Sequence, residues 1–396
     1  MALRILHIAP YGPEAWAYGG IPRVVGAMVH GLRARGHHVT LCTTDALDAQ
    51  TRLPRAAAGS APDRRVFRNL SNRAAYHLQA FAPVGLRRFL DTNSAAFDLA
   101  HIHACHHLLG IMASRALARA GVPYILSPNG TAPVFERRLI AKRVLLQLGG
   151  AEVMARASRV VAVSAAEARQ FRALGIAPDA VALVPNPVDL REFDGRPDGS
   201  RFRRKYRLDG RPLVLFLGKI TPRKHVRTLV EAFAQLGPGC AQLVIAGNDL
   251  GGLSEALDRA GELGLRDRVV APGLLPGAER LEALAAADVV VYPSSDEVFG
   301  LVACEALLAG TPVIVGNDSG AAEVVASTGG GLAVTPGDAA GLARTIATVL
   351  DDGEHWRREA GDAGVRVRAL YGADTVVSAL EAVYDSVVGR ALQASA

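Results

Sequence analysis

Residues 288–305 read DVVVYPSSDEVFGLVACE, an apolar stretch that passes through a polar turn into a second apolar stretch. Asp288–Tyr292 has the length and β-branching of a buried strand, and the spacing of Gly300–Leu308 predicts a helix. The first backbone N–H groups of a helix have no carbonyl partner within it, and the helix dipole makes that end positive. The turn is therefore suited to binding hydroxyl or phosphate oxygens.

The same strand–turn–helix unit recurs along the chain. Pro22–Arg35 carries apolar residues at helical spacing, and helices are predicted at the end of the chain over Ala339–Leu350 and Tyr371–Leu392. Residues 45–65 lack periodicity and are predicted to form a mobile loop. Strands alternating with helices predict an α/β fold with parallel sheets. Besides Asp288–Tyr292, the predicted strands are Ile5–Ala9, Val39–Thr43, Leu99–His103, Pro123–Ser127, Arg159–Val163, Val181–Val184, Pro212–Leu217, Gln242–Ala246, Arg268–Ala271 and Pro312–Val315.

Two series of these units predict two doubly wound, Rossmann-like domains. Pro185–Pro187 ends the first series, and the polar stretch Asp194–Ser200 is the predicted linker. We expect domains at 1–190 and 191–370, with a final helix at 371–396 that can pack back on the N-terminal domain. The two sheets are expected to face each other across a cleft, because ligands of such sheets bind at the carboxyl ends of the strands.

The composition is that of a globular protein, with 50% hydrophobic and 21% charged residues in 396. No apolar run approaches the ~18 residues that cross a bilayer, and the N-terminus lacks the apolar segment of a signal peptide. Four cysteines lie far apart in the sequence, which favours reduced thiols. These features predict a cytoplasmic protein. The cysteines are Cys42, Cys105, Cys240 and Cys304.

The net charge of +6 is unevenly distributed. Residues 1–190 carry 22 basic and 11 acidic side chains, a surplus of +11, whereas the remaining residues carry 22 and 27, a surplus of −5. Such an asymmetry favours an anionic partner for the first half. The alternative is an arginine-rich composition with no functional meaning.

A second strand-to-helix turn carries an unusual choice of cations. Residues 212–226 read PLVLFLGKITPRKHV, and they include two of only four lysines in a chain with forty arginines. A compact ammonium at a helix start is suited to binding phosphate, which explains why Lys219 and Lys224 are not arginines. The alternative is a solvated basic turn.

Two glutamates accompany the first turn. Glu297 precedes the predicted helix and Glu305 lies about two turns into it. A carboxylate at a strand end can order sugar hydroxyls, and one on the helix can accept hydrogen bonds from ribose hydroxyls. Two glutamates alone would be read as part of an ordinary capped helix, but the lysine pair favours a binding site.

Several other classes lack their motifs. No G-x-G-x-x-G follows a strand, and no G-x-x-x-x-G-K-[ST] is present, which argues against a dinucleotide dehydrogenase and a P-loop ATPase. There is no Asp-x-Asp to hold a metal beside a diphosphate. Two lysines and a helix end are therefore expected to stabilise the negative charge of the diphosphate in place of a metal ion. Aromatic residues do not interleave with the basic ones as in a nucleic-acid-binding module, so no nucleic acid partner is expected.

Taken in order, the motifs resemble the large family of retaining glycosyltransferases called family 4, of GT-B architecture, over nearly the whole chain. The family's E-x7-E signature is matched by Glu297 and Glu305, and its G-[RK]-x4-K signature by Gly218, Lys219 and Lys224. Its glycine-rich first turn is matched by Gly19 and Gly20, and the Pro-Asn before its linker by Pro185 and Asn186.

The resemblance implies a metal-independent hexosyltransferase that uses a nucleotide-diphosphate sugar as donor substrate and no cofactor. It further implies an acceptor-side N-terminal domain, a donor-binding C-terminal domain, and a role in surface polysaccharide or glycolipid synthesis. Glu297, Lys219 and Lys224 would be the catalytic residues, with the lysines on the diphosphate and Glu297 on the donor sugar. Donor contacts are expected from Gly19, Gly20, Gly218, Leu274, Val298, Phe299, Gly300, Leu301 and Glu305.

Three features depart from the family pattern or are not explained by it. Asn129 stands where the family often has a histidine, and an amide cannot accept a proton at neutral pH. His225 replaces a usual glycine after Lys224. The histidines His101, His103, His106 and His107 gather near one strand end; a metal site is the less favoured interpretation, and we expect them to line the cleft, with His103 and Asn129 contacting the acceptor or a sugar.

Two other functions of the same architecture stay open, a sugar-nucleotide epimerase and a non-catalytic sugar-nucleotide-binding module. A phosphorylase is disfavoured because neither Lys142 nor Lys205 falls at a strand end where a pyridoxal group could be held.

Two basic, partly apolar segments of the first half predict contact with an anionic membrane surface and a lipid-linked acceptor. The competing interpretation is that their apolar residues are buried within the domain. The first segment contains Arg64, Arg65, Arg68, Arg73, Arg87 and Arg88 around Phe67, Tyr76, Leu78, Phe81, Leu86 and Phe89; the second contains Arg137, Arg138, Lys142 and Arg143 among Val134, Phe135, Leu139, Ile140, Val144 and Leu145.

Overall fold

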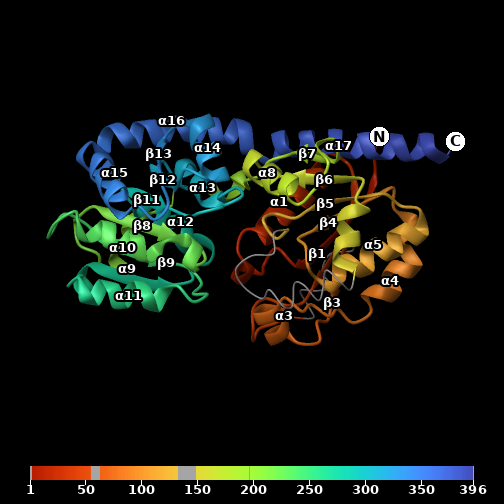
Figure 1. Ribbon diagram of the computed structural model, residues 1–396, viewed down its shortest axis with the longest axis horizontal. Helices are drawn as coiled ribbons and strands as arrows, with labels where there is room; N and C mark the ends of the chain where they lie inside the picture. Colours follow the sequence, from red (N-terminus) through yellow and green to blue (C-terminus); the bar gives the residue numbers. More distant parts are fainter. Residues whose placement is uncertain (1, 55–62, 133–148, 196, 396) are drawn as a thin grey trace. The chain divides into compact units, whose positions relative to one another are not determined.

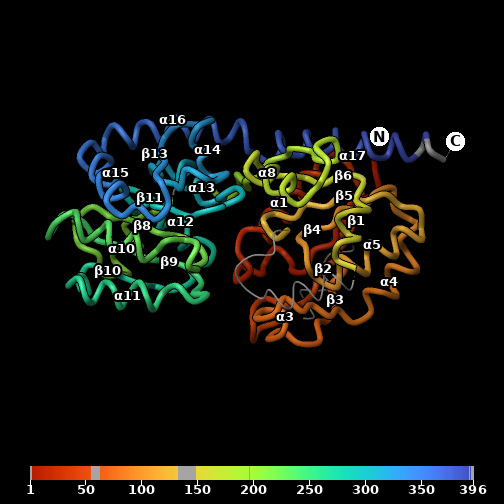
Figure 2. The backbone as a smooth tube through the Cα atoms, in the orientation of Figure 1, coloured from red at the N-terminus to blue at the C-terminus, as the bar shows by residue number. Residues whose placement is uncertain are grey.

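The computed structural model describes residues 2–54, 63–132, 149–195 and 197–395 (Figure 1). Its contacts divide the chain into two compact units. The first comprises Met1–Pro187 together with Ala373–Ala396, and the second is Val188–Gly372. In Figure 2, the chain leaves the first unit in yellow-green and returns to it in dark blue, as the helix α17 (Ala373–Ser395).

The first unit is built on a seven-stranded parallel sheet with the strand order β3-β2-β1-β4-β5-β6-β7. Its central strands are buried along nearly their whole length, as expected for strands covered on both faces. The strands are β1 (Arg4–Tyr11), β2 (His38–Thr44), β3 (Arg64–Phe67), β4 (Leu99–His103), β5 (Tyr124–Ser127), β6 (Arg159–Ala162) and β7 (Val181–Leu183).

The helices of the first unit include α17, although it comes from the end of the chain. Glu381 of α17 accepts hydrogen bonds from Arg35 at 2.6 Å and pairs with His37 at 2.7 Å, so α17 is fixed beside the end of α1. The others are α1 (Ile21–Ala34), α3 (Asn72–Leu78), α4 (Leu86–Asn93), α5 (Leu108–Ala120), α7 (Ala151–Ala155), α8 (Ala165–Ala173), and the short turns η1 (Trp16–Tyr18), η2 (Ser94–Ala96) and η4 (Pro178–Ala180).

The second unit has a six-stranded parallel sheet with the order β10-β9-β8-β11-β12-β13. The strands are β8 (Leu213–Leu217), β9 (Gln242–Ala246), β10 (Val269–Gly273), β11 (Val289–Tyr292), β12 (Val313–Gly316) and β13 (Gly331–Val334). The helices are α9 (Gly199–Lys205), α10 (Val226–Ala234), α11 (Leu253–Glu262), α12 (Gly277–Ala286), α13 (Leu301–Leu308), α14 (Gly320–Thr328), α15 (Ala339–Asp351) and α16 (Gly353–Tyr371), with turns η5 (Leu190–Phe193), η6 (Pro222–Lys224) and η7 (Arg266–Arg268).

The α/β fold with two parallel, Rossmann-like sheets is confirmed, but three elements were not predicted. The buried face of α16 consists of Ala360, Ala363, Gly364 and Val367. Most of these residues are small, so the sequence of α16 lacks the large apolar side chains at helical spacing that would predict a helix. The strand β13 begins at a glycine, and β3 is an edge strand that starts with two arginines. The predicted loop 45–65 was wrong at its end, because β3 already begins at Arg64; residues 55–62 lie outside the described part of the chain.

Candidate active site

The strand order of the second sheet reverses direction between β8 and β11, which lie side by side. In doubly wound sheets the loops that leave such a pair of strands diverge to opposite faces and open a crevice at the carboxyl end. The two motifs found in the sequence follow β8 and β11. The fold therefore brings the lysine turn and the E-x7-E turn together.

Lys224, at the end of η6, is buried beside the residues that follow β11. Its Nζ donates to the Tyr292 hydroxyl at 2.5 Å and to the Ser294 hydroxyl at 3.1 Å, and it forms an ion pair with Glu297. Tyr292 in turn donates to Oε2 of Glu297 at 2.7 Å. An ammonium has three N–H donors, so these three partners occupy them. Contact with a diphosphate would require the ammonium to exchange at least one partner.

The ion pair determines the charge of the site. Burial by itself would raise the pKa of Glu297, but the positive charge of Lys224 and the hydrogen bonds from Lys224 and Tyr292 lower it to about 2. Burial and the neighbouring carboxylate raise the pKa of Tyr292 well above its usual value. At neutral pH the site therefore holds an ionised carboxylate, and Tyr292 acts as a hydrogen-bond donor to it.

Main-chain hydrogen bonds fix the turns against each other. The N–H of Ser295 donates to the carbonyl of Arg223 at 3.0 Å, and the N–H of Gly320 donates to the carbonyl of Glu297 at 2.7 Å. His225 has a φ of +51°, the left-handed conformation that glycine adopts most easily. Its Nε2 lies 2.6 Å from the Ser295 hydroxyl. The left-handed turn explains the family's usual glycine, and the bond to Ser295 gives the histidine a structural role.

Gly300 is the N-cap of α13 and has a φ of +71°. A Cβ at this position would lie 2.7 Å from Cβ of Ala321. A side chain is thus excluded both by the backbone conformation and by the packing of α14. The close approach fixes the N-cap of α13 three residues after Glu297.

Glu305 is buried in α13, and its Oε2 lies 2.7 Å from Nη1 of Arg280 in α12. Arg280 also pairs with Glu192, in η5. The sequence motifs did not reveal Arg280, because no spacing links it to Glu305. The ribose contact predicted for Glu305 would be made by a carboxylate that already has a buried cationic partner.

The remaining predicted donor residues of this unit lie around the same edge of the sheet. Gly218 and Lys219 leave β8, and Leu274 is an exposed residue directly after β10. Val298 and Phe299 are buried and Leu301 opens α13. Val298 and Phe299 precede the N-cap Gly300, and Leu301 is the first helical residue, whose backbone N–H has no carbonyl ahead of it in the helix.

The predicted residues of the first unit also follow the central strands of their sheet. Gly19 ends η1 with a φ of +91°, and Gly20 is the N-cap of α1. His103 ends β4 and is completely buried. Asn129 lies two residues beyond β5 with a φ of +51°, and its Oδ1 is buried without a hydrogen-bond partner in the described part of the chain. That acceptor is available for a donor from a bound ligand.

All four histidines predicted to line a cleft are buried, and two of them bond backbone groups instead. His107 is the N-cap of α5, with Nδ1 accepting from the N–H of Gly110 and Nε2 close to the carbonyls of His103 and Ala104. His106 bonds the carbonyl of Ala132 at 2.8 Å. Both shape the loop after β4. His101 and His103 instead stack with their centroids 4.1 Å apart and are joined by His7 from β1, which was not predicted.

Residues in the left-handed conformation gather at these loops. Of the seven described non-glycine residues with positive φ, five lie in loops that follow β4, β5, β8 or β11. Such conformations are unfavourable for residues with a Cβ and cluster at functional sites. They are Ala104, His106, Asn129, His225 and Asp296.

The first basic segment was only partly interpreted correctly. Of its six apolar residues, Leu78 is exposed, whereas Phe81 and Leu86 are core residues and Phe67, Tyr76 and Phe89 pack partly against the core. The competing interpretation therefore holds for these five. Other large apolar side chains of this region, Leu70 and Val84, are 71% and 54% exposed. The second segment, with Arg137, Arg138, Lys142 and Arg143, lies outside the described residues. Within those residues, no helix is both long and apolar enough to span a membrane.

The ion pair of Glu297 leads to a prediction about acid stability. A carboxyl whose pKa is 4.5 when unfolded and about 2 when folded stabilises the fold above pH 4.5, and this contribution is lost as the pH falls toward 2. Wild-type protein should thus lose about 2 kcal/mol more stability between pH 5 and pH 3 than Glu297→Gln. Urea unfolding at both pH values measures the difference; parallel curves for the two proteins would show that the pair is not ionised as described.

Comparison with known proteins identifies the family of the chain. A model of "Glycosyltransferase Family 4" matches residues 18–192, and one of "Glycosyl transferases group 1" matches residues 199–364. The chain is 34% identical over 298 residues to the D-inositol 3-phosphate glycosyltransferase of Acidothermus cellulolyticus, covering 70% of this chain and 65% of that protein, slightly less than two thirds of its length. It is 32% identical over 275 residues to the 2-deoxystreptamine glucosyltransferase of Streptomyces kanamyceticus, covering 64% and 68%.

The fold is also similar to that of solved structures. The crystal structure of Anabaena Alr3699/HepE in complex with UDP and glucose matches with a TM-score of 0.77 at 21% identity, over 97% of this chain and 100% of that one. WaaG, a glycosyltransferase involved in lipopolysaccharide biosynthesis, matches with a TM-score of 0.66 at 18% identity, over 97% and 100%.

Two Rossmann-like parallel sheets, each with a switch point between its central strands, define the chain as a GT-B protein. With both family models matched in sequence order, it belongs to glycosyltransferase family 4, among the group 1 glycosyltransferases.

Proposed function

We propose that this chain is a retaining, metal-independent hexosyltransferase that takes a sugar from a nucleotide-diphosphate donor. The observation that supports this most is the buried group of Lys224, Tyr292 and Glu297 at the switch point of the second sheet, directly before the positive end of α13. Structures of similar fold in complex with UDP and glucose, and with UDP-glucose, make a UDP-sugar the first donor to test.

The reaction requires stabilisation of a leaving nucleoside diphosphate. The bond between the anomeric carbon and the diphosphate oxygen breaks, the acceptor hydroxyl oxygen bonds to that carbon, and the hydroxyl proton passes to the leaving phosphate. Negative charge grows on the diphosphate as the bond breaks. Lys219, Lys224 and the N–H groups at the start of α13 would stabilise that charge, and one preorganised donor of this kind typically contributes about 3–4 kcal/mol.

Lys224 and Glu297 would act as exchanging partners. In the structure, the ion pair with Glu297 holds the ammonium of Lys224 in place. Arrival of a diphosphate would offer the ammonium a second anion, and Glu297 could then accept hydrogen bonds from sugar hydroxyls. Glu305 would bind the ribose while Arg280 holds its other side, and Leu274 would lie near the base.

For the acceptor, we propose a glycan or lipid-linked sugar in surface polysaccharide or glycolipid synthesis, contacted by His103 and Asn129 in the first unit. Polar, buried atoms at the ends of β4 and β5 support a hydroxyl-bearing ligand there. A second candidate is a small cyclic polyol, because the similar proteins are named for transfer to D-inositol 3-phosphate and 2-deoxystreptamine.

A sugar-nucleotide epimerase and a sugar-nucleotide-binding module are the alternatives to this function. Incubation of the protein with UDP-, GDP- and ADP-hexoses, with and without a panel of acceptors, separates the three. A transferase releases the nucleoside diphosphate in an acceptor-dependent way and forms a glycoside. Conversion of the donor alone to its epimer, or binding without turnover, would contradict the proposal.

Metal independence gives a direct prediction. Because two lysines and a helix end are proposed to balance the diphosphate charge, transfer should be unchanged by an excess of EDTA. The measurement is initial rate before and after chelation. A clear loss that added Mg²⁺ or Mn²⁺ restores would show that the charge is balanced by an ion instead.

A lipid-linked acceptor would place the first unit at an anionic membrane surface at the cytoplasmic side. The exposed Leu70, Leu78 and Val84 lie among exposed arginines at positions 65, 68, 73, 87 and 88, a combination that favours such a surface. Each basic residue near an anionic bilayer contributes about 1 kcal/mol.

Sedimentation with liposomes tests this. Binding should rise with the fraction of anionic lipid and fall with salt, and the variant Leu70→Ser/Leu78→Ser should bind more weakly at equal charge. Protein that stays in the supernatant with strongly anionic vesicles at low salt would contradict membrane contact and favour the small cyclic polyol as acceptor.

A further inference from the structure

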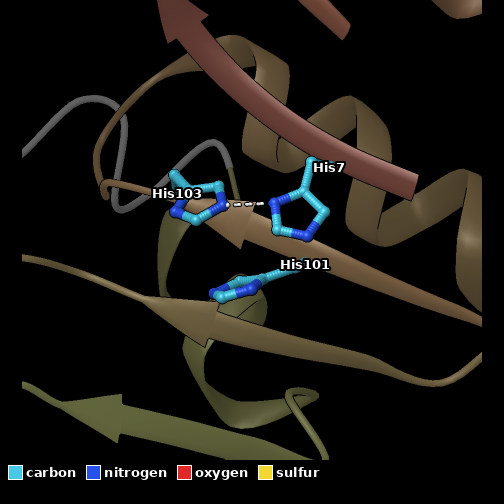
Figure 3. A group of neighbouring side chains, drawn as sticks. All are labelled: His7, His101 and His103. Carbon is cyan, nitrogen blue, oxygen red and sulfur yellow. Dashed lines mark hydrogen bonds between the residues drawn. The ribbon is translucent and has the colours of Figure 1, made fainter. Parts of the chain in front are cut away.

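Three histidines meet inside the first unit, in the central strands of its sheet. His7 comes from β1, and His101 and His103 come from the adjacent β4. Figure 3 shows the three rings turned toward one another, and all three are fully buried. The proposed chemistry at the end of β4 uses only His103. His7 and His101 have no role in it.

The histidines are linked through Tyr384 of α17 into one chain of hydrogen bonds. Nε2 of His103 lies 2.9 Å from Nδ1 of His7, whose Nε2 lies 3.3 Å from the Tyr384 hydroxyl. That hydroxyl lies 2.8 Å from Nδ1 of His101, and Nε2 of His101 lies 2.7 Å from the hydroxyl of Ser127. Five of the six ring nitrogens are thereby engaged. The sixth, Nδ1 of His103, is buried without a hydrogen-bond partner in the described part of the chain.

All three rings are neutral at physiological pH. Burial lowers the pKa of His103 to about 3, and burial together with the neighbouring histidines lowers the pKa of His7 and His101 well below the usual value. A neutral imidazole has one N–H and one lone pair. Each ring in the chain must therefore donate on one side and accept on the other.

Only two proton arrangements satisfy every contact and also use the buried Tyr384 proton in a hydrogen bond. In one, Ser127 donates to His101, His101 to Tyr384, Tyr384 to His7 and His7 to His103, which leaves the proton of His103 on Nδ1. In the other, every direction is reversed, and Nδ1 of His103 becomes a lone-pair acceptor. The Tyr384 hydroxyl is the connection that couples the two halves, because it is the single link between His7 and His101 in this chain.

We propose that Tyr384 is a positioning residue, which acts through His7 and His101 to hold the His103 ring and to set whether its Nδ1 donates to or accepts from a sugar hydroxyl. This inference rests on the proposed glycosyltransferase function. In this proposal α17 contributes to the reaction through Tyr384, although the sequence of α17 carries no recognisable motif. Three ring nitrogens, one from each histidine, lie within 4.8 Å of one another and could bind a metal ion. The four existing hydrogen bonds, and the absence of a carboxylate or cysteine from this group within the described part of the chain, favour the hydrogen-bonded chain instead.

The test compares Tyr384→Phe with Tyr124→Phe. Each substitution removes one buried hydroxyl from the first unit and keeps the ring; the Tyr124 hydroxyl bonds Ser114 at 2.9 Å and the Val153 carbonyl at 2.7 Å, away from the histidines. Tyr384→Phe should lower kcat roughly three- to tenfold with donor KM within twofold. Tyr124→Phe should keep the wild-type kcat even if its melting temperature falls as much as that of Tyr384→Phe.

Two further measurements separate positioning from stability. In a His103→Ala background, Tyr384→Phe should lower kcat no further, since residues that act as a unit are not additive. The ¹⁵N spectrum of the imidazoles should show a changed tautomer of His103 in Tyr384→Phe and not in Tyr124→Phe, and this readout requires no activity.

The outcomes are distinct. If wild-type protein transfers no sugar, the proposed function fails, while the ¹⁵N spectrum still tests the hydrogen-bonded chain. If wild type transfers sugar and Tyr384→Phe has the kcat of Tyr124→Phe, the positioning role is wrong. Tight binding of one equivalent of Zn²⁺ that Tyr384→Phe leaves intact and His7→Ala abolishes would overturn it in favour of a metal site.

Discussion

Lys224→Ala is expected to lower the kcat of sugar transfer by about two to three orders of magnitude, because it removes a preorganised cation from the leaving diphosphate. The loss should appear in kcat more than in donor KM, since the interaction strengthens as charge develops on the leaving group. Steady-state kinetics with the best donor measures both. A folded variant with near-normal kcat would contradict the assignment of Lys224.

The matched control is Lys205→Ala, another of the four lysines. Lys205 is 59% exposed and pairs with Glu279 at the surface, so its removal should change stability by less than about 1 kcal/mol and leave kcat unchanged. Equal losses in the two variants would point to a general effect of removing positive charge.

Because Lys224 is buried, its truncation is expected to lower the stability of the fold as well as the activity. Lys224 is only 6% exposed, and its removal leaves Glu297 charged without its closest cation. Removing one partner of a buried ion pair typically destabilises a protein by about 3–5 kcal/mol, and we expect a loss of stability of about this size in Lys224→Ala. The double variant Lys224→Met/Glu297→Gln should regain most of that stability and remain inactive, which separates folding from catalysis.

Glu297→Gln is expected to lower kcat by about two orders of magnitude at neutral pH, with the fold retained. The amide keeps the size of the side chain but cannot accept through two charged oxygens, so sugar hydroxyls lose their acceptor and Lys224 loses its counter-ion. Single-turnover rates at saturating donor isolate this chemical loss from binding.

Glu279→Gln is the corresponding control. Glu279 also accepts from a lysine and a tyrosine, Lys205 and Tyr206, but at the surface of α12, away from the switch point. It should keep the wild-type kcat. Should Glu297→Gln transfer sugar as fast as Glu279→Gln, the carboxylate would have no part in the reaction and the E-x7-E resemblance would not extend to its first glutamate.

Much of the fold could be predicted because its central strands are buried on both faces and are therefore continuous apolar runs. β8, β9, β11 and β12 were each located within a residue or two. The polar, small-residue helix α16 and the edge strands β3 and β13 were missed, since their burial depends on neighbours far along the chain.

Some residues of the candidate site could likewise be predicted from the sequence, and others could not. Lys224 and Glu297 could be found because each stands in a strand-to-helix turn with a recognisable spacing. Tyr292, Arg280 and Tyr384 could not, because they reach their partners only through the folded sheet or through a helix at the end of the chain. His7 was detectable only as a histidine within a largely apolar first strand, a pattern that does not reveal its partners.

Equilibrium binding of radiolabelled UDP-, GDP- and ADP-hexoses to wild-type protein and to Lys224→Ala tests the central claim most directly, namely that the switch point of the second sheet holds a nucleotide-diphosphate sugar. The account predicts that wild type binds at least one of these donors, that the free nucleoside diphosphate competes, and that Lys224→Ala binds it more weakly while Lys205→Ala binds as wild type does. Failure of wild type to bind any of them, or equal binding by wild type and Lys224→Ala, would contradict it.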